Sequence, residues 1–296
     1  NGQASIYAPF FDIDWQPANP VLRGKVLTPV LGDPYGVVLE RGELELRFER
    51  ETGSFAVWYH QHRFPLNPRT YPAVLERALQ VVSSAELESL CAAFRHLPTR
   101  DDLSPERITE RNRDKEFHKR RLAALCEADH EVCEAVEAAV RALRGSPGDP
   151  SSFDALHELL ERQPYRLAYW RVASDDINYR RFFDVNDLAA LRMDNEAVFE
   201  ATHRLVLDLL AEGKVDGLRI DHPDGLYDPA QYFSRLQERV AAMAGATLPA
   251  ALPENDRREL PLYLVVEKIT AGFERLPTSW PVHGTTGYRF ANMVNG

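Results

Sequence analysis

The sequence predicts a parallel α/β fold for residues 166–296. Two short apolar stretches, residues 215–221 and 262–269, have the pattern of strands, and a helical pattern precedes each of them. Helices that alternate with apolar strands are typical of a parallel sheet covered by helices. Residues 262–269 are apolar almost throughout, as in a strand that is buried on both faces.

The composition and the charge of the chain limit its partners. The 296 residues suffice for one large or two ordinary domains, and 44% of them are hydrophobic, as in ordinary globular proteins. Lys and Arg total 35 and Asp and Glu total 45, which gives a net charge of −10. This charge argues against nucleic acid or an anionic membrane as the main partner. It leaves a neutral substrate such as a sugar open.

Three cysteines, Cys91, Cys126 and Cys133, lie outside any CxxC pair and without a cluster of histidines nearby. Their spacing is unlike a disulfide framework or a zinc site, so we expect a reduced, cytoplasmic protein. The chain shows no apolar run near the ~18 residues of a membrane span and no signal-peptide pattern. It lacks an initiator Met, and we expect an internal piece of a longer protein.

Residues 1–36 are rich in proline and in aromatic residues, which favours an extended loop region over a helix. The aromatics of residues 10–15 could line a sugar site, because rings stack on the apolar faces of sugars. They could also anchor the long loop to the core. We favour the second interpretation, because large aromatic side chains mostly serve packing.

The sequence pattern of residues 37–165 predicts an inserted, mainly helical subdomain with a β-hairpin. The hairpin pattern covers residues 43–60 and turns at Thr52-Gly53. The interleaved charges of residues 100–121 have the pattern of a solvated face. The predicted helices cover residues 85–97, 117–143 and 153–162.

Residues 166–296 complete the predicted order of elements. A strand-like stretch at 165–172 precedes a polar, aromatic loop at 175–187. A helix that Asp194 caps and Gly213 ends comes next. The strand that ends at Asp221 follows, Asp228 and Pro229 begin a second helix, residues 262–269 form the next strand, and residues 284–290 can form a third.

Carboxylates end the first two of these strands. Side chains alternate between the faces of a strand, so Arg219 and Asp221 share one face while Leu218 and Ile220 share the other. A buried Arg219 beside Asp221 would keep that carboxylate ionised and lower its pKa. Glu267 holds the last position of the next strand, at the end where parallel-barrel enzymes carry their catalytic groups.

A carboxylate at a strand end is often only a helix cap or a solvated loop residue. Two of them on neighbouring strands, with Arg219 aligned beside one, favour chemistry instead. One carboxylate can attack an anomeric carbon while the other, kept protonated, donates to the leaving oxygen. Arg219 would push the two pKa values apart, as these two roles require. The pair therefore indicates glycoside hydrolysis or transfer.

The two strand ends also resemble known motifs. Gly217-Leu-Arg-Ile-Asp221 resembles the nucleophile motif of the alpha-amylase family (glycoside hydrolase family 13), and Val266-Glu267 resembles its acid/base motif. Within that family, stretches spread over nearly the whole chain are similar, in order, to the trehalose-forming members. They are residues 10–15, 22–25, 177–184 and 217–227 together with 265–269.

The resemblance implies part of a (β/α)8 TIM barrel with a largely helical insertion. Residues 1–36 would be a loop region that follows an absent barrel strand, and residues 37–165 would be the insertion. Residues 166–296 would be a partial catalytic barrel. About three of the eight strands would lie in this chain.

The resemblance also implies an activity, with Asp221 as nucleophile, Glu267 as acid/base residue and Arg219 orienting Asp221. The implied reaction is an intramolecular transglucosylation that converts the reducing-end α-1,4 bond of a maltooligosaccharide or glucan to an α,α-1,1 (trehalose) bond. It needs no cofactor and no metal, and a trehalose-releasing hydrolase would be the pathway partner. We assign His222 and Lys268 to sugar-hydroxyl contacts, although each could equally be a supporting or surface group.

The chain departs from the family at two motifs. An earlier Asp-Asn-His motif and a later His-Asp motif are both missing from it. We therefore predict that this chain alone is inactive or very weakly active. Three alternatives stay open: another glycosidase or transglycosylase of the alpha-amylase family, a non-catalytic glucan-binding fragment, and a metal-dependent barrel enzyme with His222 and Asp224 as ligands.

Overall fold

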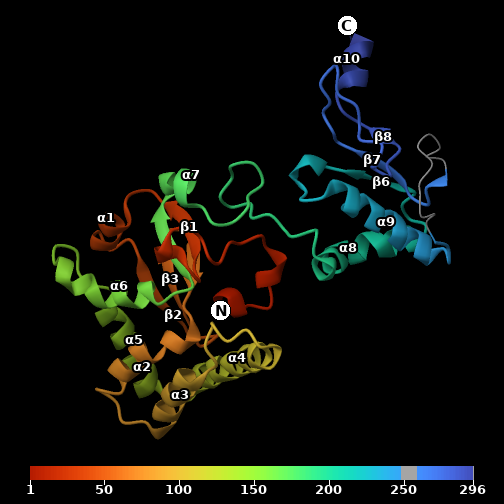
Figure 1. The fold of residues 1–296 in the computed structure, drawn as a ribbon. Coiled ribbons are helices and arrows are strands. Elements are labelled where there is room, and N and C mark those ends of the chain that lie inside the picture. The colour runs from red at the N-terminus through yellow and green to blue at the C-terminus, as the bar shows by residue number, and fades with distance from the viewer. Residues whose placement is uncertain (248–258, 296) are drawn as a thin grey trace. The chain divides into compact units, whose positions relative to one another are not determined.

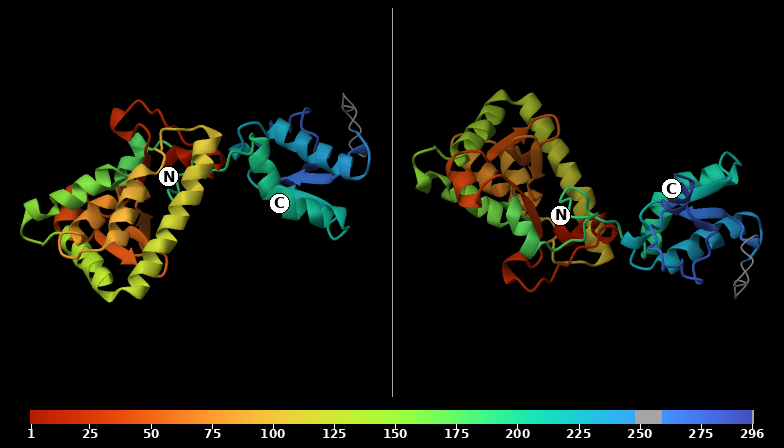
Figure 2. Two further views of the ribbon diagram at one scale, coloured as in Figure 1. Left: turned by 90° about the horizontal axis from the view of Figure 1, so that it is seen from below. Right: turned by 90° about the horizontal axis from the view of Figure 1, so that it is seen from above.

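The computed structural model describes residues 1–247 and 259–295 of the chain. The chain divides into two compact units, Asn1–Ala190 and Leu191–Gly296, which we call unit 1 and unit 2 and describe separately (Figures 1 and 2). Each unit has its own sheet structure and its own hydrophobic core.

A parallel pair of strands joins segments of unit 1 that are far apart in the sequence. Strand β1 (Val26–Leu31) pairs with β5 (Tyr165–Tyr169). The strand predicted around residues 165–172 is confirmed in β5, but β1 lies in the region that we predicted as a loop. That prediction was wrong at β1 because Pro29 argues against a strand. Among the described strands, β1 pairs with β5 alone, and such an edge position tolerates a residue without an N–H.

The predicted β-hairpin is confirmed as β2 (Glu45–Glu49) and β3 (Ser54–Tyr59), and β4 (His62–Pro65) extends it to a three-stranded antiparallel sheet. Gly53 turns the chain with φ +61°, and a Cβ atom there would lie 1.9 Å from the backbone oxygen of Lys119. Only glycine therefore fits this turn without displacing the neighbouring helix.

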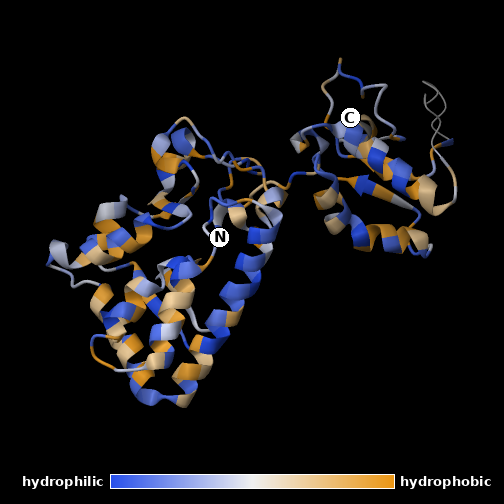
Figure 3. Cartoon of the chain, turned by 60° about the horizontal axis from the view of Figure 1, so that its bottom comes forward, coloured by the Kyte–Doolittle hydropathy of each residue, from blue (hydrophilic) through white to orange (hydrophobic). Residues whose placement is uncertain are grey.

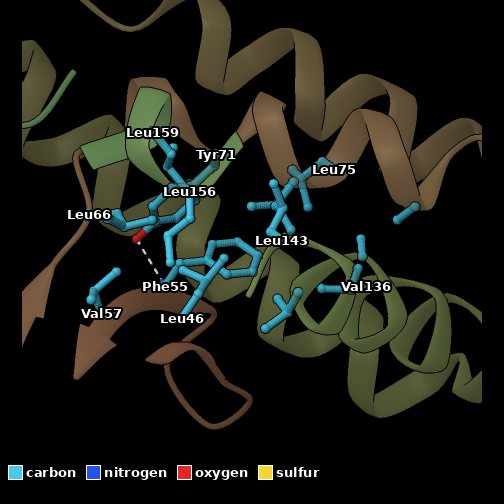
Figure 4. Close-up of a cluster of buried hydrophobic side chains, with 14 of the residues drawn as sticks. Leu46, Phe55, Val57, Leu66, Tyr71, Leu75, Val136, Leu143, Leu156 and Leu159 are labelled. Carbon is cyan, nitrogen blue, oxygen red and sulfur yellow. Dashed lines mark hydrogen bonds between the residues drawn. The ribbon is translucent and has the colours of Figure 1, made fainter. Parts of the chain in front are cut away.

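The core of unit 1 lies between this hairpin and the helices α2 (Pro72–Ala78), α5 (His130–Leu143) and α6 (Asp154–Glu161) (Figure 4). Phe55 of β3 is fully buried there, and its N–H donates to the hydroxyl of Tyr71 at 3.2 Å. Burial of such apolar side chains supplies most of the stability of a domain of this size.

The long helix predicted over residues 117–143 is wrong, because Asp129 divides it into α4 (Pro105–Ala128) and α5. The Asp129 side chain accepts a hydrogen bond from the Val132 N–H at 3.1 Å and caps α5. Helix α4 carries most of the charged run 100–121 and is mainly hydrophilic along its length (Figure 3). The other two predicted helices are confirmed as α3 (Ala85–His96) and α6.

Asn178 holds the loops at the edge of the β1–β5 sheet. Its side chain donates to the carbonyl oxygens of Asp14 and Lys25 at 2.9 and 2.8 Å, and accepts from the Leu27 N–H at 2.9 Å. A buried amide with three partners fixes the segments that it joins. Short helical segments complete unit 1: η1 (Gly2–Ala4), η2 (Ala8–Phe10), η3 (Pro20–Leu22), α1 (Tyr35–Glu40), η4 (Pro68–Thr70), η5 (Pro150–Phe153), η6 (Trp170–Val172) and α7 (Ala173–Asp176).

All three cysteines of unit 1 are buried and free. Burial raises the pKa of Cys126 to about 12 and the pKa of Cys91 above its ordinary value. The Cys126 thiol therefore stays protonated at neutral pH.

Unit 2 contains a parallel sheet of three strands in the order β6 (Gly217–Ile220), β7 (Tyr263–Val266) and β8 (Gly284–Thr285). Helix α8 (Glu196–Ala211) precedes β6, and helix α9 (Pro229–Met243) lies between β6 and β7 in the sequence. The predicted parallel α/β arrangement is therefore confirmed. Three parallel strands are a portion of what a (β/α)8 barrel contains, and the described residues do not form a closed barrel.

Helices α8 and α9 contribute the apolar layer on one face of this sheet. Phe199 of α8 and Phe233 of α9 belong to one buried cluster with Leu264 and Val266 of β7. Side chains alternate along β7, so Tyr263 points to the opposite face, where it is exposed. The prediction that this strand is buried on both faces is therefore wrong for the described structure.

The helix caps of unit 2 agree with the sequence prediction in one case of two. Asp228 caps α9, because its side chain accepts from the Gln231 N–H at 3.0 Å. Asn195 rather than Asp194 caps α8, and Asp194 instead pairs with Arg192 at 2.8 Å. The strand predicted at 284–290 shortens to β8, helix α10 (Arg289–Asn295) begins within that range, and η7 (Pro223–Gly225) follows β6.

Candidate active site

One arginine joins the two carboxylates that follow β6 and β7. The Nη1 atom of Arg219 lies 2.8 Å from Oδ1 of Asp221, and its Nη2 atom lies 3.0 Å from Oε1 of Glu267. A guanidinium is a rigid, planar fork, so it can donate to two carboxylates at once. The structure thus brings together the three residues that the strand patterns singled out.

The register of the two strands sets these carboxylates side by side. Ile220 lies opposite Val266, the last residue of β7, and the Glu267 N–H donates to the Ile220 carbonyl oxygen at 2.8 Å. Asp221 and Glu267 directly follow this pair in their strands. The alternation rule then places Arg219 and Asp221 on the same face, as predicted.

A third strand also contributes to the site. The Nε atom of Arg219 donates to Oγ1 of Thr286 at 3.2 Å, and the Thr286 N–H donates to the Val266 carbonyl oxygen at 2.9 Å. Thr286 directly follows β8, just as Asp221 follows β6. Sequence reasoning missed Thr286. The available signal was a hydroxyl side chain at the end of the third apolar stretch.

The two carboxylates have different environments. The side chain of Asp221 is 65% exposed and that of Glu267 is 26% exposed. The pKa of Asp221 is below its ordinary value, first because of a side-chain hydrogen bond with Glu267 and next because of one from Arg219. The lowered pKa of Asp221 suits the nucleophile of a retaining glycosidase pair, and the less exposed Glu267 suits its acid/base residue.

Arg219 itself is not buried, contrary to the prediction. Its side chain is 46% exposed, because it lies on the face of the sheet that α8 and α9 leave uncovered. The predicted lowering of the Asp221 pKa is confirmed, although the hydrogen bond with Glu267 contributes more to it than Arg219 does.

Lys268 connects the loops that follow β6 and β7. Its Nζ atom lies 3.0 Å from Oδ2 of Asp224 and 3.0 Å from Oε1 of Glu274. Hydrogen bonds with these carboxylates, that with Asp224 first, raise the pKa of Lys268 above its ordinary value. Two carboxylates of the protein thus already engage the ammonium group, which favours a supporting role over a direct sugar contact.

His222 adopts a backbone conformation that is uncommon for a residue with a side chain. Its φ of 44° and ψ of 54° lie in the left-handed region. The ring lies against Gly225, where a Cβ atom would be 2.5 Å from Cδ2 of His222. Such strain persists only where the surrounding structure imposes it, and it is concentrated at functional sites. The charge of His222 also helps to lower the pKa of Asp221.

Known proteins resemble the chain in sequence and in structure. A Mycobacterium tuberculosis protein (strain CDC 1551 / Oshkosh) named "Putative maltooligosyl trehalose synthase" is 39% identical over 154 residues, which are 51% of this chain and 17% of that protein. The maltooligosyltrehalose synthase structure from Arthrobacter ramosus matches 97% of this chain and 23% of its own, with a TM-score of 0.51 and 30% identity. The chain is thus similar in sequence and in structure to maltooligosyltrehalose synthases.

The predicted resemblance to trehalose-forming enzymes is thereby confirmed. The structure of a hypothetical maltooligosyl trehalose synthase from Sulfolobus tokodaii, at 22% identity and a TM-score of 0.51, shares the fold over 99% of this chain and 24% of that one. No family model matches the chain. The chain spans 17% of the length of the curated synthase and about a quarter of the solved ones.

The stretches that resemble these synthases occur in both units. In unit 1, residues 177–184 contact the earlier stretch through the ion pair of Arg180 with Asp12, at 2.9 Å. In unit 2, residues 217–227 and 265–269 carry the carboxylates and the Lys268 contacts.

The metal-dependent alternative gains no support from the side-chain arrangement. Within residues 1–247 and 259–295, no group of three or more His, Cys, Asp or Glu side chains could hold a metal ion. The pair of His222 and Asp224 therefore lacks a third ligand in that part of the chain. Among the same residues, no helix combines the length and the apolar character needed to cross a membrane.

Proposed function

We propose that the protein that contains this chain is a maltooligosyltrehalose synthase. It converts the reducing-end α-1,4 bond of a maltooligosaccharide to an α,α-1,1 bond by intramolecular transglucosylation. The observation that carries this proposal is the Arg219 guanidinium, which Asp221 and Glu267 share at 2.8 and 3.0 Å. The similarity to the synthases supports it.

Asp221 is the proposed nucleophile, because its lowered pKa keeps it ionised at neutral pH. Its carboxylate forms a bond to the anomeric carbon while the α-1,4 bond breaks, and the leaving oxygen takes the proton of Glu267. Retaining pairs of this kind lie about 5–5.5 Å apart, which suits two carboxylates held by one guanidinium.

The second half of the reaction reuses the same two groups. The released glucose stays in the site and turns, and its anomeric hydroxyl attacks the glycosyl-enzyme. Glu267, now ionised, takes the hydroxyl proton while the bond to Asp221 breaks. Two displacements at one carbon retain its configuration, and water must be kept out for transfer to prevail over hydrolysis. The chemistry requires no cofactor.

We keep both His222 and Lys268 as proposed sugar-contacting residues, but the observations that support a sugar contact are stronger for His222 than for Lys268. His222 directly follows Asp221, and its unusual backbone conformation supports a functional position. Lys268 would reach a sugar hydroxyl only while it also holds Asp224 and Glu274. We therefore propose that Lys268 acts mainly by fixing the two loops.

The proposed domain organisation places residues 37–165 as an insertion between residues 1–36 and 166–296. The parallel pairing of β1 with β5 supports it, because these strands flank the insertion and bring its two ends together. We also propose a cytoplasmic location, which the buried, free thiols support, and a trehalose-releasing hydrolase as the pathway partner.

Counting reducing ends tests the function. The intact protein that contains this chain is incubated with maltopentaose, and reducing ends and chain length are followed over time. We expect reducing ends to disappear without shortening of the chain, and Asp221→Asn to abolish this loss. A rise in reducing ends would mean that hydrolysis dominates and would overturn the synthase proposal. The 296-residue chain alone should show little or no activity, because it spans 17% of its curated relative.

A further inference from the structure

Unit 1 contains an open pocket whose lining includes neither Asp221 nor Glu267. Its volume is about 610 Å³, within the usual range of ligand sites. Segments from η6 and α7 form one side, and the loop of residues 177–190 forms the other. The lining includes the side chains of Trp170, Arg171, Ser174, Arg181, Asp184 and Asn186.

Trp170 supplies a large aromatic surface to this pocket. The residue is 51% exposed, although indole is among the side chains that gain most from burial. The guanidinium of Arg171 lies over the ring, 5.2 Å from its centroid. This contact restrains the indole at the pocket wall, where it is available for stacking against a ligand.

Hydrogen-bonding groups of the loop line the same pocket as Trp170. The guanidinium of Arg181 contacts the Asp184 carboxylate at 3.2 Å and donates to the side-chain oxygen of Asn186. The Asp184 side chain is almost fully exposed, so most of its acceptor positions are open to solvent or to a ligand. The pocket thus offers both donors and acceptors next to one apolar ring.

The loop that carries these groups is held in place by its own bonds. The Tyr179 hydroxyl donates to the Asn186 carbonyl oxygen at 2.7 Å, and the Asn186 amide donates to the Pro29 carbonyl oxygen at 3.4 Å. Phe183 has φ +49°, a left-handed conformation that such a bulky residue rarely adopts. A loop that is both fixed and strained is typical of a preorganised binding site.

These features favour a neutral polyhydroxylated ligand over an anion. The exposed Asp184 carboxylate would repel a phosphate or a carboxylate, and it already offsets the charge of Arg181, while the second guanidinium of the lining, that of Arg171, lies over the Trp170 ring. A pyranose ring has apolar faces that stack on indole and an equatorial belt of hydroxyls that donate and accept. The mixture of one ring with donors and acceptors matches that chemistry.

We propose that the pocket lined by Trp170 and Arg181 binds glucosyl residues of the maltooligosaccharide, as a glucan-binding site in unit 1. The substrate class rests on the proposed function. A glucosyl ring stacks on Trp170, and its hydroxyls bond to Asp184, Asn186 and Ser174.

Hydroxyl-radical footprinting locates the ligand directly. The intact protein carrying Asp221→Asn, which should not consume the sugar, is oxidised with and without maltohexaose, and Trp170 modification is quantified by mass spectrometry. We expect maltohexaose to protect Trp170. Phe117 of α4 is the matched control, because it is also 51% exposed but lies outside the pocket, and its oxidation should not change. Equal protection of both residues, or of neither, would overturn the proposal.

Substitution of the ring measures its contribution. Trp170→Ala should weaken maltohexaose binding in calorimetry by about tenfold, as for a central aromatic anchor, whereas Trp170→Phe should keep most of the affinity. Phe117→Ala should bind as the wild type does. Unchanged affinity of Trp170→Ala would overturn the proposal, as would competition by inorganic phosphate, which would indicate an anion site.

The two proposals fail separately. Trehalose-end formation with no dependence of binding on Trp170 would remove the pocket assignment and leave the synthase function. Protection of Trp170 without any trehalose-end formation by the wild type would leave a glucan-binding site and remove the synthase function. Circular dichroism confirms that each variant is folded, which a half-exposed position such as Trp170 should permit.

Discussion

At the Arg219 guanidinium, a single cation serves two carboxyl groups that must behave differently. In the proposed mechanism, Asp221 must be ionised to attack, and Glu267 must carry a proton to donate. The nearly equal distances of 2.8 and 3.0 Å mean that Arg219 holds both groups in position. Their surroundings then distinguish them, because the Asp221 side chain is 65% exposed and the Glu267 side chain is 26% exposed.

Arg219→Lys should therefore damage catalysis despite conserving charge. An ammonium group cannot replace a planar fork, and slight misplacement of reacting groups costs about 100-fold in rate, so we expect a loss of that order in kcat for trehalose-end formation. Arg239→Lys is the matched control, because Arg239 also bridges two carboxylates, Glu196 and Glu200, at 2.6 and 2.5 Å. Similar losses in both variants would show that Arg219 acts only through general stability.

The pH dependence of kcat/KM provides a second test at the same residue. The native pKa of Asp221 lies below its ordinary value of 3.8, so its ionised form persists, and activity that depends on it is kept, as the pH falls through 3.8. The acid limb of the profile should therefore lie below that value. The Arg219→Lys substitution weakens one of the interactions that lower the pKa of Asp221. The acid limb should therefore move to higher pH in this variant. An acid limb that stays in place would contradict the role assigned to Arg219.

The alternation of side chains along a strand was sufficient to predict the pair of Arg219 with Asp221. It also placed Glu267 at the end of the next strand. Alternation was not sufficient to predict Thr286. The Thr286–Arg219 hydrogen bond joins the outer strands of the sheet, and a contact of this kind does not appear in the residue pattern of either strand. Nor did alternation predict the exposure of Arg219, which depends on what covers the sheet rather than on local pattern.

Among the elements, the β2–β3 hairpin depends on Gly53 for two separate reasons. The residue has φ +61°, and it lies directly against the backbone of α4. A positive φ costs a residue with a Cβ atom roughly 1–2 kcal/mol, and a backbone clash adds to that cost.

Gly53→Ala should thus be far more destabilising than a second alanine substitution that matches its backbone conformation. Gly24 has φ +68°, but a Cβ atom there would have nothing within 4 Å. We expect Gly24→Ala to lower the free energy of unfolding by about 1 kcal/mol and Gly53→Ala to lower it by more than about 3 kcal/mol in urea titrations. Equal losses would mean that α4 moves aside at no cost.

The predicted helix boundaries were wrong where a single residue determines whether a helix continues or ends. The helical spacing of apolar residues continues through Asp129, and only the side-chain cap at that residue separates α4 from α5. Asp194 and Asn195 are both good caps, and the choice between them depends on the ion pair of Asp194 with Arg192. Long apolar patterns such as α3 and β7 were predicted well, because burial dominates there.

In the molecule as a whole, the two units bury their apolar surface to different degrees. Unit 1 encloses one large cluster of buried side chains between its sheets and helices. Unit 2 covers a single face of its sheet with α8 and α9, and Tyr263 on the opposite face is exposed. The division after Ala190 could not be predicted from composition, because the contacts of residues 166–190 with β1 join distant parts of the chain.

Unit 1 should therefore fold when it is produced alone as residues 1–190. We expect a cooperative thermal transition by circular dichroism and a single set of dispersed amide resonances. Residues 191–296 alone should melt at lower temperature and with less cooperativity, because one side of a three-stranded parallel sheet is left against water. A sharper or higher transition for residues 191–296 would contradict this ranking.

The pairing of Ile220 with Val266 has a consequence for evolution and for engineering. A one-residue insertion or deletion within β6 would turn Asp221 to the apolar face and bring Arg219 out of alignment with Glu267. Length changes should therefore be excluded from residues 217–221 and 263–267 among functional descendants of this gene. A library that varies chain length should leave these two short segments unchanged. It should place its insertions in the turn between Gly225 and α9, where they do not alter the register of β6 against β7.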